Sequence, residues 1–224
     1  MTFIVAIDGP AGAGKGTITK QVSEKLGFIN IDTGAMYRCV TLEMLEKNID
    51  FDDNENIEKL LGEIKIDLKK ENGKDLFFLN GRDVTTEIRT KKINENVSQV
   101  SHIPIIRQNM SGLQRKMAIG KEVIMEGRDI GTNVFPDADV KIYLDATPEE
   151  RANRRYKQNK EAGIESNYDE ILENIKFRDY NDKTSKVAPL KMADDAIYLD
   201  STNLNIDEVV EKVVSIIKDR LDRK

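Results

Sequence analysis

Apolar and polar positions along the chain follow two periods, one typical of buried strands and one typical of amphipathic helices. Residues 3–7 are almost uninterruptedly apolar, as expected for a parallel strand buried on both faces. In residues 15–26 apolar side chains recur every four positions, which predicts a helix that ends at Gly27. Thr147-Pro148, followed by two glutamates, predicts the start of another helix. The same patterns predict strands at 28–31, 122–125, 140–144 and 196–199, and helices at 35–47, 90–101, 104–119, 168–182 and 206–221.

The alternation of strand and helix, with short turns between them, predicts an α/β fold in which helices cover both faces of a parallel sheet. One region departs from this pattern. Asn72-Gly73 and Asn80-Gly81 are both strong hairpin signals, and they flank the apolar run 76–79. We therefore expect a small antiparallel subdomain at residues 60–95. The core is then formed by residues 1–59 and 96–224.

Composition narrows the class of protein without identifying it. Hydrophobic residues make up 39% of the 224 residues, enough for a normal core, and the net charge of −5 argues against a surface that binds nucleic acid or anionic membranes as a whole. No hydrophobic leader segment precedes the first strand, and no apolar run reaches the ~20 residues needed to span a bilayer. The single cysteine, Cys39, excludes an intramolecular disulfide. A cytoplasmic location is the expectation, and the lone histidine, His102, is expected to be structural.

The segment that follows the first strand carries the strongest chemical signal. A phosphate needs several backbone N–H donors in one concavity at the start of a helix, and glycines permit the backbone conformations that this requires. A lysine then supplies a full charge to the transferring phosphate. This segment meets each requirement, so we expect ATP to bind at Gly9, Pro10, Ala11, Gly12, Ala13, Gly14, Lys15, Gly16 and Thr17.

Charged residues at the ends of other predicted strands indicate a second substrate site. Arg38 lies one turn into the helix after residues 28–31, and Arg128 follows residues 122–125. Ligands of open α/β sheets bind at this carboxyl edge, and the planar fork of arginine suits an acceptor phosphate. Arg178 and Asp182 lie four apart on one helix, a spacing that an ordinary surface ion pair would also explain.

These segments together resemble the bacterial-type cytidylate kinase family of P-loop nucleoside monophosphate kinases. The resemblance runs from residue 4 to the C-terminal helix. Its motifs are I-D-G-P-A-G-A-G-K-G-T at 7–17, D-T-G-A-M-Y-R at 32–38, S-Q-V at 98–100, E-G-R-D-I-G-T at 126–132, F-P-D-A at 135–138, E-E-R-A-x-R-R at 149–155 and A-P-L at 188–190. The resemblance implies that the insert at 60–95 is a nucleotide-monophosphate-binding subdomain and that a helical lid lies at about 151–167.

The resemblance also implies a role for each matching residue. The residues expected to bind CMP are Thr33, Tyr37, Arg38, Ser98, Arg107, Arg128, Asp129, Arg178 and Asp182. Within this set, Ser98, Arg107 and Asp129 correspond to positions that read the cytosine ring. The residues expected to be catalytic are Lys15, Arg128, Arg151, Arg154 and Arg155. Mg²⁺ is expected to contact Thr17 and Glu126, through water.

The chain departs from the family pattern at two positions. Glu126 stands where the family more often has aspartate beside the magnesium site. Ser185 stands where family members usually have an arginine that contacts the acceptor phosphate. Lys186 is adjacent, and its flexible side chain is a candidate replacement.

The implied activity is transfer of the γ-phosphoryl group of ATP to CMP or dCMP by a monomer that binds neither nucleic-acid polymers nor membranes. Two alternatives stay open at this point. A kinase for another acceptor, such as UMP or shikimate, would not need the base-reading set. A non-enzymatic nucleotide-binding switch would not need second-site arginines, and a GTPase-type switch would carry an N-K-x-D segment, which the sequence lacks.

Overall fold

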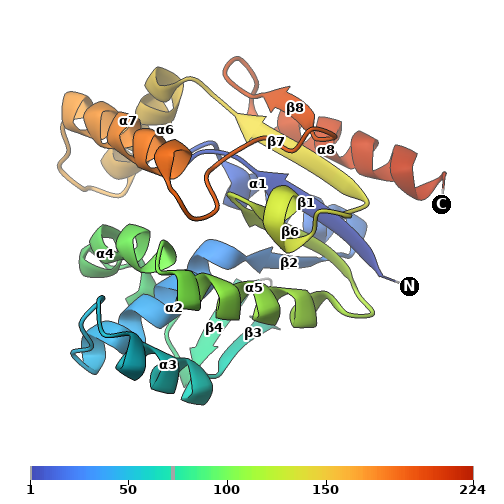
Figure 1. Ribbon diagram of the computed structural model, residues 1–224. Coiled ribbons are helices and arrows are strands. Elements are labelled where there is room, and N and C mark those ends of the chain that lie inside the picture. Colours follow the sequence, from blue (N-terminus) through green and yellow to red (C-terminus); the bar gives the residue numbers. More distant parts are fainter. Residues whose placement is uncertain (1, 72–73, 224) are drawn as a thin grey trace. The chain divides into compact units, whose positions relative to one another are not determined.

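The computed structural model describes residues 2–71 and 74–223. The chain forms two compact units, a core unit of Met1–Ile31 with Ala118–Lys224 and an insert unit of Asp32–Met117. The antiparallel segment expected at 60–95 lies inside the insert unit. Figure 1 follows the course of the chain through the elements of each unit.

The main sheet contains five strands in the order β2-β6-β1-β7-β8. β1 pairs in parallel with β6 and with β7, and β7 pairs in parallel with β8. This arrangement confirms the predicted parallel α/β architecture. The strands are β1 (Phe3–Asp8), β2 (Ile29–Asp32), β6 (Glu122–Gly127), β7 (Val140–Asp145) and β8 (Ile197–Asp200).

Helices α1 (Lys15–Leu26) and α8 (Ile206–Leu221) bury their apolar faces in the same core cluster as the sheet. Ile142 and Leu144 of β7 point into this cluster. Tyr143 lies between them and therefore faces the other side of the sheet, since successive strand residues alternate in direction. The other helices of the core unit, α6 (Pro148–Glu161) and α7 (Tyr168–Thr184), pack against each other (Figure 1).

The insert unit contains a second, antiparallel sheet in the order β3-β4-β5. Asn80 and Gly81 both have positive φ, 52° and 85°, as the predicted hairpin turn requires. The other predicted hairpin signal, Asn72-Gly73, lies outside the described residues. The elements of this unit are α2 (Thr33–Glu46), α3 (Asn54–Glu63), β3 (Ile66–Glu71), β4 (Lys74–Leu79), β5 (Arg82–Asp83), the 3₁₀ turn η1 (Glu87–Arg89) and α4 (Lys91–Ser101), followed by α5 (Pro104–Ala118).

Helix α3 and the π-helical turn η2 are among the elements that were not predicted from the sequence. Helix α3 begins after Asp53, whose side chain accepts a hydrogen bond from the Asn56 amide and so caps the helix. The π-helical turn η2 (Ile130–Val134) follows the end of β6. π-Helical turns occur mostly as single turns and frequently at functional sites. Its position after a strand of the main sheet places it at the carboxyl edge, where the sequence predicts a substrate site.

Three further observations bear on the sequence expectations. Cys39 is fully buried, and this burial raises the pKa of its thiol to about 12. His102 contacts the Ser98 carbonyl oxygen through Nδ1 at 2.6 Å, which agrees with the structural role expected for it. Within residues 2–71 and 74–223, no helix has both the length and the apolar character that a membrane crossing requires.

Candidate active site

The loop between β1 and α1 has a backbone that only glycine can form at its key positions. Gly9 has a φ of 152°, and a Cβ there would lie 2.0 Å from the Leu144 carbonyl oxygen. Gly14 precedes α1 with a φ of 89° in the left-handed region and has no side chain with which to cap the helix. The first N–H groups of α1 are therefore open to an anion, which the positive end of the helix dipole also favours.

Lys15, the first residue of α1, is turned into its own loop. Its Nζ donates hydrogen bonds to the carbonyl oxygens of Gly9 at 2.7 Å and Pro10 at 2.8 Å, and the residue is 6% exposed. Burial, and then the charge of Arg128, lower the pKa of its ammonium to about 7. An anionic phosphate beside the loop would counter both effects, so the site is built to receive negative charge.

Glu126, near the end of β6, lies against the start of α1. A Cβ on Gly16 would be 3.1 Å from Glu126 Oε1, so glycine at this position leaves room for the carboxylate. The Thr19 hydroxyl lies 3.5 Å from the same oxygen, and Thr17 is exposed. Oxygen atoms of this kind suit Mg²⁺, which keeps several waters and binds largely through substrate phosphates. Across the described residues no cluster of three or more His, Cys, Asp or Glu forms a metal cage.

Arg128 and Asp182 come from distant parts of the chain and meet in the core unit. Arg128 Nε donates to Asp182 Oδ2 at 2.9 Å, and the two side chains are 30% and 15% exposed. Arg178 lies one turn earlier than Asp182 on α7. Three of the predicted CMP-binding residues are thus carried by one strand end and one helix.

Asp129 is 4% exposed, and its carboxylate is held in place by a neighbour that the sequence analysis did not single out. Asn133 Nδ2 donates to Asp129 Oδ2 at 3.0 Å, and the Asn133 amide donates to the Asp129 carbonyl oxygen at 2.9 Å. These contacts fix the direction of the carboxylate. In the sequence, the only sign of this contact is the D-x-x-x-N spacing. The spacing indicates a contact between the two side chains only when a π-helical turn is known to join them.

The three arginines expected in the lid have different surroundings. Arg151 is 2% exposed, and its guanidinium donates to the Ala146 and Ala11 carbonyl oxygens, each at 2.9 Å, and to the Asp179 carboxylate. Arg154 bonds to Glu150 and Ser201. A Cβ on Gly14 would lie 4.0 Å from Arg154 Nη1, which places this guanidinium beside the phosphate loop. Arg155 is exposed and bonds to Gln158.

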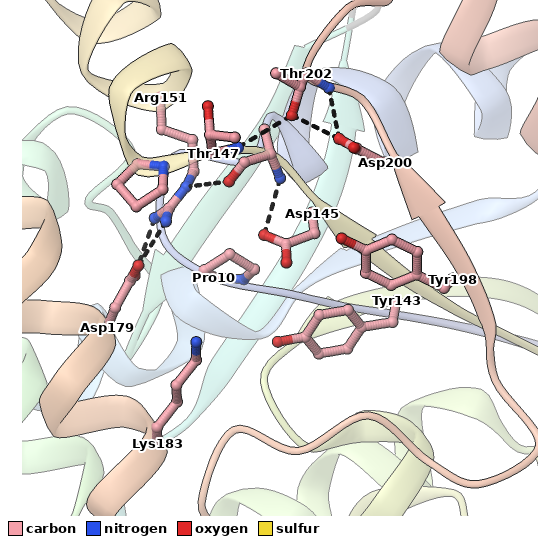
Figure 2. A pocket seen from close by; sticks show the side chains of 12 residues that line it. Pro10, Tyr143, Asp145, Thr147, Arg151, Asp179, Lys183, Tyr198, Asp200 and Thr202 are labelled. Atoms are coloured by element: carbon pink, nitrogen blue, oxygen red, sulfur yellow. Dashed lines mark hydrogen bonds and ion pairs between the residues drawn. The ribbon is translucent and has the colours of Figure 1, made fainter.

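A polar pocket of about 260 Å³ lies beside the first residues of the phosphate loop, and Figure 2 shows its lining. Pro10 forms part of one wall, and the Arg151–Asp179 ion pair lies next to it. The rings of Tyr143 and Tyr198 stack with centroids 6.2 Å apart and form the opposite wall. Burial and the charge of Asp145 raise the pKa of Tyr143 to about 12, so its hydroxyl stays protonated.

The predicted residues of the insert unit form two local arrangements. Asp32 caps α2 by accepting the Ala35 amide at 2.8 Å, and its other oxygen accepts Arg38 Nη2 at 2.9 Å. The same carboxylate thus starts the helix and orients the arginine. The Arg107 guanidinium lies 5.7 Å from the ring centre of Tyr37 and donates to the Ser101 carbonyl oxygen at 2.9 Å.

The remaining residues singled out in the sequence are Thr33, Ser98, Ser185 and Lys186. Thr33 is buried at the start of α2, and Ser98 is half-buried on α4. Ser185 follows α7, and its hydroxyl donates to the Val187 carbonyl oxygen at 2.8 Å. Lys186 is exposed. The segment after α7 contains no helix or strand before β8.

The sheet order, together with a glycine-rich loop between the first strand and a helix, defines a P-loop protein. A solved structure of an uncharacterized protein from Eubacterium ventriosum shares this fold, with a TM-score of 0.51 and 11% sequence identity. The comparison covers 96% of this chain and 98% of that chain. At such low identity the likeness concerns the fold alone.

The chain belongs to the cytidylate kinase family. The family model for cytidylate kinase matches residues 5–219. A cytidylate kinase of Fusobacterium nucleatum is 56% identical over 208 residues, covering 93% of this chain and 94% of that protein. A cytidylate kinase of Lactobacillus johnsonii is 51% identical over 214 residues, covering 96% and 93%. These matches confirm the resemblance that the motifs indicated.

The surroundings of Arg151 predict that it stabilises the fold. Arg151→Met leaves the Asp179 carboxylate, 8% exposed, without its counter-charge, so we expect the free energy of unfolding to fall by about 3–5 kcal/mol. The double variant Arg151→Met/Asp179→Leu should recover much of this loss, because no buried charge is left unpaired. Urea denaturation followed by circular dichroism measures both.

Arg155→Ala is the matched control, since its guanidinium is exposed on the same helix. Its unfolding free energy should lie within about 0.5 kcal/mol of the wild type. An unchanged urea midpoint in Arg151→Met, accompanied by loss of activity, would instead assign Arg151 to substrate contact.

Proposed function

We propose that this chain is a nucleoside monophosphate kinase that transfers the γ-phosphoryl group of ATP to CMP or dCMP. The observation that carries the proposal is the match to the cytidylate kinase family along nearly the whole chain, residues 5–219. The same match disfavours a shikimate kinase or a nucleotide-binding switch. Family relatives at 56% and 51% identity bear the name of this enzyme.

The donor phosphates are assigned to the loop from Gly9 to Thr17. The open N–H groups of α1 would bind phosphate oxygens, and Lys15 would exchange its two loop carbonyls for the anion. Thr17 and Glu126 are the residues that would hold Mg²⁺, through water, and this ion would neutralise charge on the phosphates. The position of Glu126 against the start of α1 fits that assignment.

The acceptor phosphate is assigned to Thr33, Arg38 and Arg128. Arg38 is aimed by Asp32, and Arg128 is held by Asp182. Charge-assisted hydrogen bonds from guanidinium groups to a phosphate are among the strongest that proteins make. Arg178 and Asp182 are assigned to the sugar, where a carboxylate can accept ribose hydroxyl protons. Ser185 stands where the family usually has an arginine, and Lys186 is assigned to contact the acceptor phosphate in its place.

The choice of base is assigned to Ser98, Arg107 and Asp129, with Tyr37 beside Arg107. Cytosine presents an exocyclic amine, which a carboxylate can accept, next to a ring nitrogen and a carbonyl that arginine and serine can meet. Uracil presents a carbonyl where cytosine has the amine, so Asp129 would oppose one acceptor with another. The buried carboxylate, fixed by Asn133, supports this assignment.

The chemistry needs no covalent enzyme intermediate. The oxygen of the acceptor phosphate attacks the γ-phosphorus, and the bond to the oxygen that bridges to the β-phosphate breaks in line. Residues of the chain contribute by positioning two anions and by stabilising the charge on the transferring group. Lys15, Arg128, Arg154 and Arg155 are assigned to this task, with Arg151 acting on the loop itself. A lid at about 151–167 would exclude water and prevent hydrolysis of ATP.

The proposed setting is a cytoplasmic monomer whose partners are the small molecules ATP and CMP or dCMP. The buried free thiol of Cys39 is compatible with a reducing compartment. The net charge of −5 supports the expectation that nucleic-acid polymers are not partners.

The direct test is a coupled assay for ADP formation across CMP, dCMP, UMP, AMP and shikimate. We expect CMP or dCMP to have the highest kcat/KM, and ADP formation to require an acceptor. Highest kcat/KM with UMP, AMP or shikimate would overturn the proposed substrate. Stoichiometric ATP binding without turnover for any acceptor would favour the nucleotide-binding switch.

The place of Lys15 at the start of α1 predicts a large kinetic effect. Lys15→Ala should lower kcat at least a hundredfold, equivalent to about 3 kcal/mol of transition-state stabilisation, while the fold is retained. Lys25→Ala, which removes an exposed lysine from the last turn of the same helix, is the control and should keep wild-type kcat. Wild-type kcat in folded Lys15→Ala would exclude Lys15 from the reaction.

The surroundings of Asp129 predict a selective effect on the base. Asp129→Ala should reduce kcat/KM for CMP by far more than for UMP, because it removes the acceptor for the cytosine amine. Asp137→Ala, an exposed carboxylate a few residues later, serves as the control and should leave both values unchanged. Equal losses for CMP and UMP would make Asp129 structural.

A further inference from the structure

We propose that Asp8 is a positioning residue that sets acceptor binding and base choice by holding the segment that carries Arg128 and Asp129. This proposal rests on the proposed function, since it concerns the acceptor site of that reaction. Asp8 ends β1, directly before the phosphate loop, and no part of the donor or acceptor assignment uses it.

The carboxylate of Asp8 is bound on both oxygens by backbone groups more than 120 residues away. The Ile130 amide donates to Oδ1 at 2.8 Å, and the Gly131 amide donates to Oδ2 at 2.7 Å. Asp8 is 5% exposed, so these bonds are shielded from water. Two short charge-assisted bonds to one carboxylate fix a backbone segment in both position and direction.

Ile130 and Gly131 are the first residues of the π-helical turn η2, and the first N–H groups of any helix have no partner within it. Asp8 supplies the missing acceptors. The other end of the turn closes back on Asp129, because the Asn133 and Val134 amides donate to the Asp129 carbonyl oxygen at 2.9 and 3.2 Å. Asp129 is therefore clamped between the Asp8 contact and the Asn133 side chain.

Gly131 makes the approach of Asp8 possible. A Cβ on this residue would lie 3.2 Å from Lys141 Cδ and 3.4 Å from Asp8 Oδ2. Lys141 cannot easily give way, since its ammonium bonds to the Pro136 carbonyl oxygen and to both oxygens of Asp195. The close fit explains why the residue beside the carboxylate has no side chain.

The pair of contacts requires a carboxylate. Burial raises the pKa of Asp8 to about 6, with the charge of Asp129 acting in the same direction, while the two amides and Lys15 act against it. The group is therefore ionised near neutral pH. An asparagine of the same shape offers one acceptor oxygen and one NH₂ group, which only donates, so one of the two backbone amides would face a donor.

The experiment compares Asp8→Asn with the wild type for CMP, UMP and ATP. We expect the KM for CMP to rise at least tenfold, and the CMP-to-UMP ratio of kcat/KM to fall at least fivefold, with the KM for ATP within twofold of the wild type. Loss of charge beside Lys15 alone would act differently, raising the KM for ATP and lowering kcat equally with both acceptors. That second result, or an unchanged CMP-to-UMP ratio, would overturn the proposal.

Gly131→Ala provides a second route to the same contact and keeps the charge of Asp8. It should raise the KM for CMP at least threefold and lower the CMP-to-UMP ratio, with the KM for ATP unchanged; wild-type values for CMP and UMP would count against the proposal. Asp137→Asn controls for a change from carboxylate to amide near η2 and should match the wild type. The assay of the wild-type protein across the acceptors tests the proposed function separately. The Asp8 test compares a variant with the wild type, so either test can fail without the other.

Discussion

The phosphate loop must keep its shape and its positive charge when no phosphate is present, and much of the core unit follows from this constraint. Within the loop the Ala13 amide donates to the Pro10 carbonyl oxygen at 3.4 Å, and the open N–H groups leave further support to other elements. Gly9 packs against the Leu144 carbonyl oxygen, and Arg151 bonds to the Ala11 carbonyl oxygen from the side. Lys15 is kept in place by two carbonyl oxygens of the loop itself. The strand β7 and the helices α6 and α7 thus serve the loop as its scaffold.

The proposed acceptor site depends on β1, the strand that leads into the phosphate loop. Asp8 belongs to β1, which also leads into the loop, and it bonds to the turn after β6. β1 lies between β6 and β7 in the sheet, so supports for both substrate sites are attached to one central strand. A rigid central strand is the physical basis on which a donor and an acceptor anion can be aligned for in-line transfer.

The sequence predicts the fold and the donor loop well because both rest on local patterns. Apolar periodicity gave the strands of the main sheet, and Thr147-Pro148 marked the start of α6. The supporting residues escaped prediction for a physical reason. Asp8 and Asp179 bind partners far away in the sequence, and Asn133 acts within a π-helical turn. Neither kind of contact produces a periodic pattern of apolar residues. Arg151 was expected among the catalytic residues; its guanidinium bonds to the Ala146 and Ala11 carbonyl oxygens, so its proposed role is to act on the loop. The roles assigned at the CMP site rest on the family resemblance, because their residues come from separate segments of the chain.

The buried thiol of Cys39 makes the chain convenient for labelling. Thiol reagents react with the thiolate, and a pKa of about 12 leaves almost none of that form near neutral pH. The native cysteine should therefore not react with maleimides in the folded protein. Two cysteines introduced on exposed helices, one in the core unit and one in the insert unit, would then carry fluorophores without background. Energy transfer between them would report any change in the distance between the two labels when ATP or CMP is added.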